Sequence, residues 1–253
     1  MGEHASSLLR GAGENGQNKP RTAARSCRRE AGELKGLRMH FIQAFFDTID
    51  DKIAFLSHLC ALGRHDEAMT LCCTYIDGLG QAIYWRSSSH PGSTKNNSSF
   101  NFVRVLREHG EQPYLDLIHP TGFIRWLRKV ENRQKKFKGL PEKIESALQA
   151  FKGQLMKESD LLAILATILT PDEIQFLSPE LWHSSLAHIA YNRLRSPFVH
   201  SLSWYSGISF DKMNYEGAPV PEIDFSMLYD ALKSISSYAR QLSERYGSLF
   251  REK

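Results

Sequence analysis

Apolar residues recur at steps of three and four along most of the chain, which is the pattern of amphipathic helices. The first such run covers residues 41–62 and ends at Gly63, a residue type that commonly follows helix C-termini. The second run covers residues 66–84 and begins with Asp66 and Glu67, whose charges stabilise a helix N-terminus. The pattern therefore predicts two long neighbouring helices joined by a tight turn.

Proline and capping residues mark the later helix starts. Pro141 suits the first turn of a helix, and the segment 170–173 (Thr-Pro-Asp-Glu) fits a capping box with proline at its first helical position. Ser178 and the proline after it repeat this arrangement and predict a helix over 178–195. A last apolar stripe runs from about residue 224 to residue 249 and predicts a C-terminal amphipathic helix.

Two segments interrupt the helical pattern. Residues 86–98 are rich in Ser, Asn and Gly, and this composition predicts a flexible loop. Residues 207–217 begin and end with glycine and precede two prolines, which indicates a small β-hairpin. The predicted fold class is therefore all-α, a helical bundle with a small β-hairpin near 207–217.

Composition changes near residue 38. Residues 1–38 contain eight Lys or Arg against four Glu, many Gly and few large apolar residues, so we expect a disordered basic tail. Residues 39–253 then form a single predicted helical domain. Subtracting the tail from the chain totals of 32 basic and 28 acidic residues leaves 24 of each. The net charge of +4 therefore carries little information about nucleic-acid binding.

One basic stretch inside the predicted domain has two interpretations. Residues 125–138 hold the densest group of Lys and Arg outside the tail. A solvated helix face and an RNA-facing strip both fit this pattern. Its members are Arg125, Arg128, Lys129, Arg133, Lys135, Lys136 and Lys138.

Cysteine and histidine spacing argues against a metal or disulfide framework. The four cysteines form no CxxC pair, which favours reduced thiols in a cytoplasmic protein. His183 and His188 are five residues apart, whereas four would align two ligands on one helix face. No apolar run is long enough to cross a bilayer. The sequence predicts no metal, no cofactor and no membrane partner.

The segment 191–200 carries the most specific candidate chemistry, in Arg195 and His200. A histidine can take the proton of a ribose 2′-hydroxyl near neutral pH, while an arginine stabilises charge developing on the phosphate. Asn192, Arg193 and Ser196 are candidate supporting residues beside this pair. If the two side chains meet in a groove, these residue types can cleave RNA without a metal.

Spacing alone does not bring that pair together. Five residues of uninterrupted α-helix correspond to about 140° of rotation, so Arg195 and His200 would lie on different faces. Ser196 followed by proline is typical of a helix start, and a restart there changes the direction of His200. A second Arg-x4-His pair, Arg104 and His109, lies in a segment with no comparable surroundings.

The six residues Arg195-Ser-Pro-Phe-Val-His200, in a domain of this helical organisation, resemble the Arg-x4–6-His motif of the HEPN superfamily. Many members of that superfamily are metal-independent endoribonucleases of toxin–antitoxin or phage-defence systems, in which two chains form one composite site. The resemblance implies that His200 acts as general base or acid and that Arg195 holds the scissile phosphate. It also implies RNA, a second copy of the chain and an antitoxin or other partner protein as binding partners.

Two positions depart from that pattern. Ser196 stands where active members usually carry Asn, Asp or His, and Leu202 stands where members controlled by nucleotidylation often carry Tyr. A non-catalytic HEPN-like helical module for dimerisation, nucleotide binding or partner binding is therefore the alternative function. In that case Arg195 pairs with a carboxylate and His200 is a partly buried structural histidine.

Overall fold

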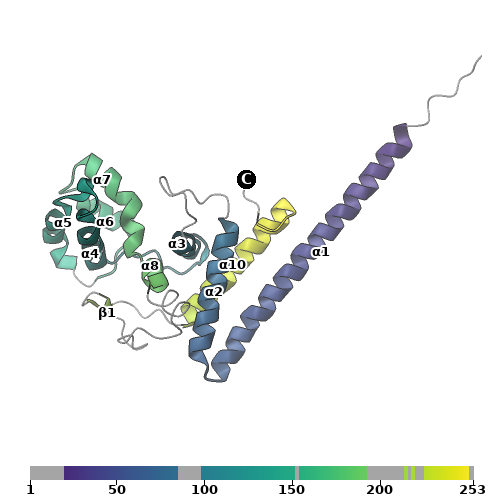
Figure 1. The fold of residues 1–253 in the computed structure, drawn as a ribbon, viewed down its shortest axis with the longest axis horizontal. Helices are drawn as coiled ribbons and strands as arrows, with labels where there is room; N and C mark the ends of the chain where they lie inside the picture. The colour runs from purple at the N-terminus through teal and green to yellow at the C-terminus, as the bar shows by residue number, and fades with distance from the viewer. Residues whose placement is uncertain are drawn as a thin grey trace, which may run out of the picture.

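The computed structural model is mostly helical in the residues that it describes (Figure 1). These are residues 20–84, 98–151, 154–192, 214–215, 218–219 and 225–250, and side-chain surroundings are described for those from residue 33 onward except 98, 214–215 and 218–219. The all-α prediction is confirmed for this part of the chain. The helices gather around two separate hydrophobic cores.

Five helices build the first core: α1 (Pro20–Ala61), α2 (His65–Ile83), α3 (Ser98–His109), α8 (Leu186–Ala190) and α10 (Phe225–Tyr246). The buried face of α1 includes Ile42, Phe46, Ile53 and Leu56, whose successive spacings of four, seven and three residues place them on one side of the helix. The predicted helix pair and its turn are confirmed, because Gly63 adopts a φ of +73° between α1 and α2. Helix α1 begins within the segment predicted to be a disordered tail.

Gly80 sets how closely α2 approaches α3. A Cβ atom at this position would lie 2.9 Å from the Asn101 carbonyl oxygen and 3.0 Å from Val105 Cγ1. Both distances are shorter than ordinary van der Waals contact, so only glycine fits without a shift of one helix. The packing of α2 on α3 in the first core therefore requires glycine at position 80 as well as the buried apolar side chains.

The second core is built from one continuous stretch, residues 118–181. Its elements are α4 (Pro120–Glu131), α5 (Leu140–Leu148), α6 (Glu158–Leu165), α7 (Pro171–Leu177) and the 3₁₀ helices η1 (Lys135–Phe137), η2 (Gln149–Phe151) and η3 (Ser178–Ser184). The capping box predicted at Thr170 and Glu173 is present at the start of α7. In sequence, the second core is inserted between two parts of the first.

Backbone hydrogen bonds join the two ends of this insertion. The Ile118 N–H donates to the Met156 carbonyl at 2.8 Å, and the His119 N–H donates to the Ser184 carbonyl at 2.8 Å. The Leu186 N–H donates to the Leu117 carbonyl at 2.9 Å. The chain therefore enters and leaves the second core at adjacent positions.

These bonds also explain why the single helix predicted over 178–195 is wrong. The structure has the 3₁₀ helix η3, an extended residue at Ser185 and then the short helix α8. The Leu186 and Ala187 N–H groups donate to carbonyls of the 115–117 segment instead of to the preceding turn. Ser185 caps α8 through its hydroxyl, which accepts from the His188 N–H at 3.2 Å.

A short antiparallel pair overlaps the end of the predicted hairpin. Strands β1 (Asn214–Tyr215) and β2 (Ala218–Pro219) pair Asn214 with Pro219 and Tyr215 with Ala218. The rest of the predicted hairpin, from 207 to 213, lies outside the described residues. So do residues 1–19 of the predicted tail and residues 86–97 of the predicted loop.

Candidate functional site

The predicted catalytic pair lies outside the described residues, and so do Arg193 and Ser196. Of the predicted site residues, the structure describes Asn192, an exposed residue that follows α8 and comes three positions before Arg195. Asn192 Nδ2 lies 2.7 Å from His188 Nε2, within hydrogen-bonding distance. The surroundings of His188 are therefore the described part of the candidate site.

Four aromatic rings lie in contact beside Asn192. His183 stacks between Trp126, at 4.7 Å between ring centroids, and Trp182, at 3.9 Å. The His188 ring meets the Trp182 ring edge-on at 5.0 Å and the His183 ring at 5.3 Å. These residues come from α4, η3 and α8, so the ring cluster joins the second core to the helix that precedes the motif.

Burial fixes the charge state of His188. Desolvation, reinforced by the neighbouring His183, lowers the pKa of His188 to about 3, so its imidazole is neutral near pH 7. A neutral imidazole with its proton on Nδ1 accepts the Asn192 amide hydrogen bond at Nε2. We infer that His188 orients Asn192 and does not itself transfer protons at neutral pH.

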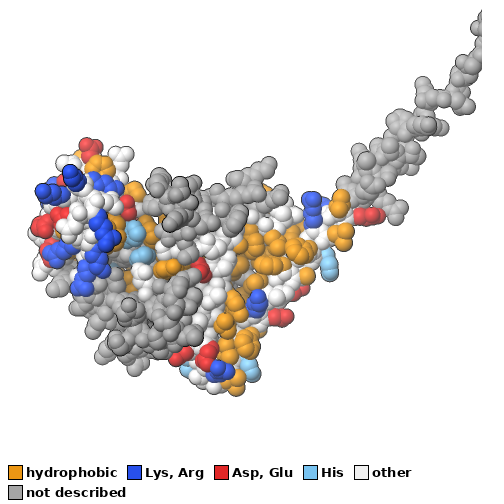
Figure 2. Space-filling view, in the orientation of Figure 1, with side chains coloured by type: hydrophobic (Ala, Val, Ile, Leu, Met, Phe, Trp, Pro, Cys, Tyr) orange, Lys and Arg blue, Asp and Glu red, His pale blue; other side chains and the backbone are white. Residues whose placement is uncertain are grey.

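A basic strip adjoins this ring cluster. We use that name for the seven Lys and Arg side chains of residues 125–138, all of which are exposed. Figure 2 shows blue Lys and Arg side chains gathered over the part of the molecule that contains α4 and α5. Within 125–138 the one acidic residue is Glu131, whose carboxylate accepts from the Gly139 N–H at 2.7 Å.

The basic strip is connected to the ring cluster through Glu180. Lys136 Nζ lies 3.8 Å from one Glu180 oxygen, and His183 Nε2 lies 3.4 Å from the other. Ile124 and Leu127 on the buried face of α4 hold the strip against the second core. The strip, the ring cluster and Asn192 therefore form one connected sequence of contacts.

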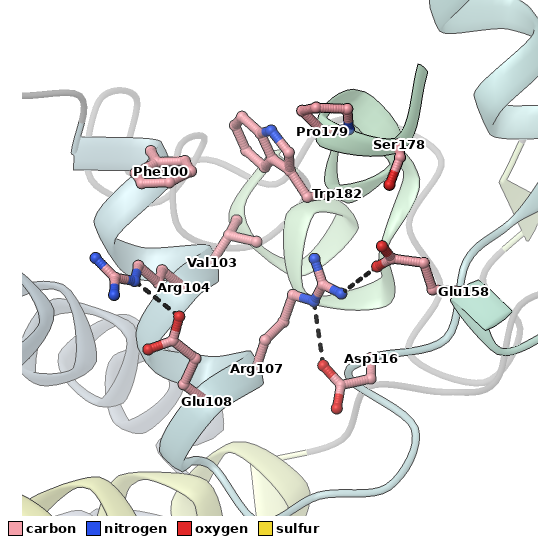
Figure 3. Close-up of a pocket in the computed structure, with 10 residues that line it drawn as sticks. All are labelled: Phe100, Val103, Arg104, Arg107, Glu108, Asp116, Glu158, Ser178, Pro179 and Trp182. Carbon is pink, nitrogen blue, oxygen red and sulfur yellow. Dashed lines mark hydrogen bonds and ion pairs between the residues drawn. The ribbon is translucent and has the colours of Figure 1, made fainter. Parts of the chain in front are cut away.

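A groove of about 370 Å³ lies on the other side of Trp182, between α3 and η3 (Figure 3). Phe100, Val103 and Trp182 supply its apolar lining. Arg107 bonds Asp116 at 3.1 Å and Glu158 at 2.7 Å, while Arg104 bonds Glu108 at 2.8 Å. Its polar lining residues are Arg104, Arg107, Glu108, Asp116, Glu158 and Ser178.

The charge balance of the groove does not suit an anionic ligand. Two guanidinium groups face three carboxylates, and both guanidinium groups already have carboxylate partners. Arg107 connects α3 of the first core with α6 of the second. We therefore interpret these ion pairs as a structural connection between the cores, and not as a phosphate site.

The fold gives the two residues of the second Arg-x4-His pair shared neighbours, Tyr84 and Glu108. The Arg104 guanidinium lies over the Tyr84 ring at 4.0 Å, whereas His109 stacks on Tyr238 at 3.5 Å between centroids. Tyr84 donates to Glu108 at 2.7 Å, and burial together with this carboxylate raises the pKa of Tyr84. His109 also stacks on Tyr84 at 6.3 Å between centroids and lies 3.9 Å from Glu108, so one cluster of structural contacts holds both side chains.

Comparisons with known proteins add no assignment. No family model, curated protein or solved structure matches this chain. Within the described ranges, no three His, Cys, Asp or Glu side chains are grouped so that they could hold a metal ion. The helices of the same ranges include none with the length and apolar character needed to cross a membrane. Cys60, Cys72 and Cys73 are free thiols.

Proposed function

We propose that this chain is a metal-independent endoribonuclease that binds RNA along the basic strip and cuts it with Arg195 and His200. The observation that supports this function best is the exposed basic strip, which is connected through the ring cluster to Asn192. Lys and Arg side chains on one surface bind the RNA backbone by releasing counterions. An asymmetric charge distribution of this kind is informative where the net charge is not.

The proposed reaction follows from the chemistry of the two motif residues. His200 removes the proton of a 2′-hydroxyl, and the resulting oxygen attacks the adjacent phosphorus. Arg195 stabilises the added negative charge on the phosphate oxygens. The bond to the 5′-oxygen breaks, and that oxygen takes up a proton from the protonated His200 or from water, so the products carry a 2′,3′-cyclic phosphate and a 5′-hydroxyl.

The first experiment tests the cleavage step. Purified full-length protein is incubated with single-stranded and structured RNA in EDTA, beside a His200→Ala variant, and the new ends are mapped. We expect EDTA-resistant cleavage that is lost in His200→Ala, with cyclic phosphate ends. Cleavage that survives in His200→Ala, or that requires a divalent cation, would refute the proposed mechanism.

The second experiment tests the basic strip separately. The double variant Arg133→Gln with Lys135→Gln should bind RNA more weakly and with a smaller salt dependence. The slope of the logarithm of the binding constant against the logarithm of the salt concentration should become shallower by about 0.7 for each phosphate of single-stranded RNA that is no longer neutralised. Lys143→Gln is the matched control, because Lys143 is exposed but already bonded to Glu173 at 2.8 Å and 3.0 Å. Equally weakened binding in both variants would show that binding does not depend on the strip.

A non-catalytic helical interaction module is the second candidate function. The observation that favours it is a row of exposed large apolar side chains on α1, including Leu37 and Phe41. Such side chains on a surface commonly mark protein–protein contacts. If RNA stays intact with the natural protein and the His200→Ala variant alike, this second function becomes the preferred one.

A further inference from the structure

Helix α1 carries a second apolar face that the described residues leave largely exposed, although Leu34 at one end of it lines a cavity beside the end of α10. Of the large apolar side chains that are exposed within the described residues, four lie on α1 and Leu62 follows its last residue. In Figure 2 the orange side chains extend along α1, and in Figure 1 the N-terminal part of α1 runs past the other helices. We call this row the α1 stripe; its members are Leu34, Leu37, Phe41, Phe55 and Leu62.

The spacing of the α1 stripe is that of a coiled-coil seam. Four members lie at multiples of seven from Leu34, and Leu37 occupies the position three residues after Leu34. In a heptad that begins with Leu34 at position a, the four members spaced by multiples of seven occupy a positions, Leu37 occupies a d position, and Ala44 is the next d residue. The stripe is about 120° around the helix from the face that packs on α2 and α10, at about 100° per residue. Helix α1 can therefore pack against the bundle and against a further helix at the same time.

The N-terminal part of α1 needs a packing partner to be stable as a helix. Isolated helices are marginal in water, and most helical stability comes from packing an apolar face. Leu34, Leu37 and Phe41 are each more than half exposed, and the first two precede Met39, where α1 begins to pack against the first core. Burial of these three side chains against another helix would stabilise this part of α1.

The charges beside the stripe select a parallel pair of identical helices. In a parallel coiled coil, each g residue faces the e residue five positions later on the partner. Asp47 and Lys52 are such a g and e pair, and so are Glu33 and Arg38, with opposite charges in both cases. An antiparallel pair instead brings e against e, and here Arg38 would lie near Lys52. All four side chains are exposed.

We propose that a second copy of this chain packs in parallel along the α1 stripe, so that two α1 helices form a short coiled coil over residues 33–52. Asp51 occupies a d position, and its carboxylate limits how far the tight seam continues toward Phe55. The face is self-complementary, as the two-fold symmetry of a homodimer requires. This inference rests on α1 alone and does not depend on the proposed ribonuclease function.

The first test measures the mass of the full-length protein by analytical ultracentrifugation over a range of micromolar concentrations. We expect a dimer, and we expect Leu37→Lys with Phe41→Lys to weaken dimerisation by on the order of a hundredfold. Both residues are exposed, so far-UV circular dichroism should show retained folding. Phe176→Lys is the matched control, because Phe176 is an exposed apolar residue on α7.

Three results would overturn the proposal. These are a monomeric natural protein throughout the concentration range, an unchanged dimer in the double variant, and an equally weakened dimer in Phe176→Lys. If the double variant does not fold, Leu34→Lys serves as the second variant, since Leu34 is exposed and lies on the α1 stripe within residues 33–52.

The second test measures the orientation of the two helices. Asp47→Lys and Lys52→Asp should each raise the dimer dissociation constant by about fivefold, because each change places like charges at two symmetric contacts. The combined variant restores opposite charges in a parallel pair and should return to within about twofold of the natural protein. Weakened dimerisation that the combined variant does not restore would exclude the parallel arrangement.

Discussion

The close approach of α2 to α3 at Gly80 gives a sharp test of the first core. Alanine at Gly80 gains the usual helix propensity, about 0.5–1 kcal/mol relative to glycine. It also places a methyl group 2.9 Å from the Asn101 carbonyl oxygen and 3.0 Å from Val105 Cγ1. Neither neighbour is the free end of a flexible chain, so the helices must separate, and overpacking of this kind costs about 1–3 kcal/mol.

Gly78 on the same helix provides the matched control. It is exposed, and a Cβ atom there would have nothing within 4 Å. Gly78→Ala therefore gains the helix propensity without the steric cost. Because both substitutions change the unfolded chain in the same way, the free energies of unfolding should differ by the overpacking cost, about 1–3 kcal/mol.

Urea unfolding followed by circular dichroism measures this difference directly. We expect the urea midpoint of Gly78→Ala to lie above that of the natural protein. The free energy of unfolding of Gly80→Ala should lie about 1–3 kcal/mol below that of Gly78→Ala, and the two variants should show a similar dependence of this free energy on urea concentration. For a chain of this size the two thermal midpoints should differ by about 2–4 °C per kcal/mol. Equal stability of the two variants would show that α2 and α3 are not packed as closely as the structure has them.

Two further predictions concern charge. Burial lowers the pKa of His119 from 6.5 to about 4, so the unfolded state binds the extra proton first. The contribution of His119 to stability should therefore fall by about 1.4 kcal/mol per pH unit as the pH is lowered from 6.5 to 4, and buried His188 adds a slope of the same sign. His119→Asn keeps an acceptor for the Gly122 N–H and should reduce this slope in urea unfolding, and an unchanged slope would contradict the burial of the His119 imidazole. Arg107→Met removes bonds to both Asp116 and Glu158 and should lower the free energy of unfolding by about 1 kcal/mol. Arg64→Met, which removes an exposed pair with Glu67 within one turn, should cost less, and equal effects would argue against Arg107 as a connection between the cores.

Local signals in the sequence were enough to predict much of the helical structure. The apolar periodicity of residues 41–62 and 66–84 and the glycine at position 63 specified the C-terminal half of α1, the turn and α2, because these features act over a few residues. The part of α1 before residue 39 was not predicted, because it has few large apolar residues. The capping box at Thr170 was predictable for the same reason. The division into two cores could not be predicted from local signals, because it depends on contacts between α3, η3 and α8, which are distant in sequence.

The break between η3 and α8 shows how such distant contacts override local patterns. The apolar spacing around Leu186 and Ile189 is helical, yet the Leu186 N–H bonds the Leu117 carbonyl far away in the chain. The ring cluster was not predictable for a related reason. Trp126 and His183 are separated by most of the second core, so no local spacing connects them. The one local signal for the ring cluster was Trp126, an aromatic residue within the Lys- and Arg-rich stretch 125–138.

The insertion of the second core between α3 and α8 has a consequence for how the chain folds. Residues 118–181 can collapse from neighbours along the chain, because their core needs no residue outside that stretch. Once they have collapsed, the bonds from His119 to Ser184 and from Leu186 to Leu117 hold the flanking segments together and shorten the effective loop between α3 and α8. Residues 118–181 are thus expected to fold early, because their contacts lie within one stretch of the chain. Their folding should lower the entropic barrier to folding of the helices of the first core. The same adjacency of its two ends would allow a short turn to replace the whole insertion.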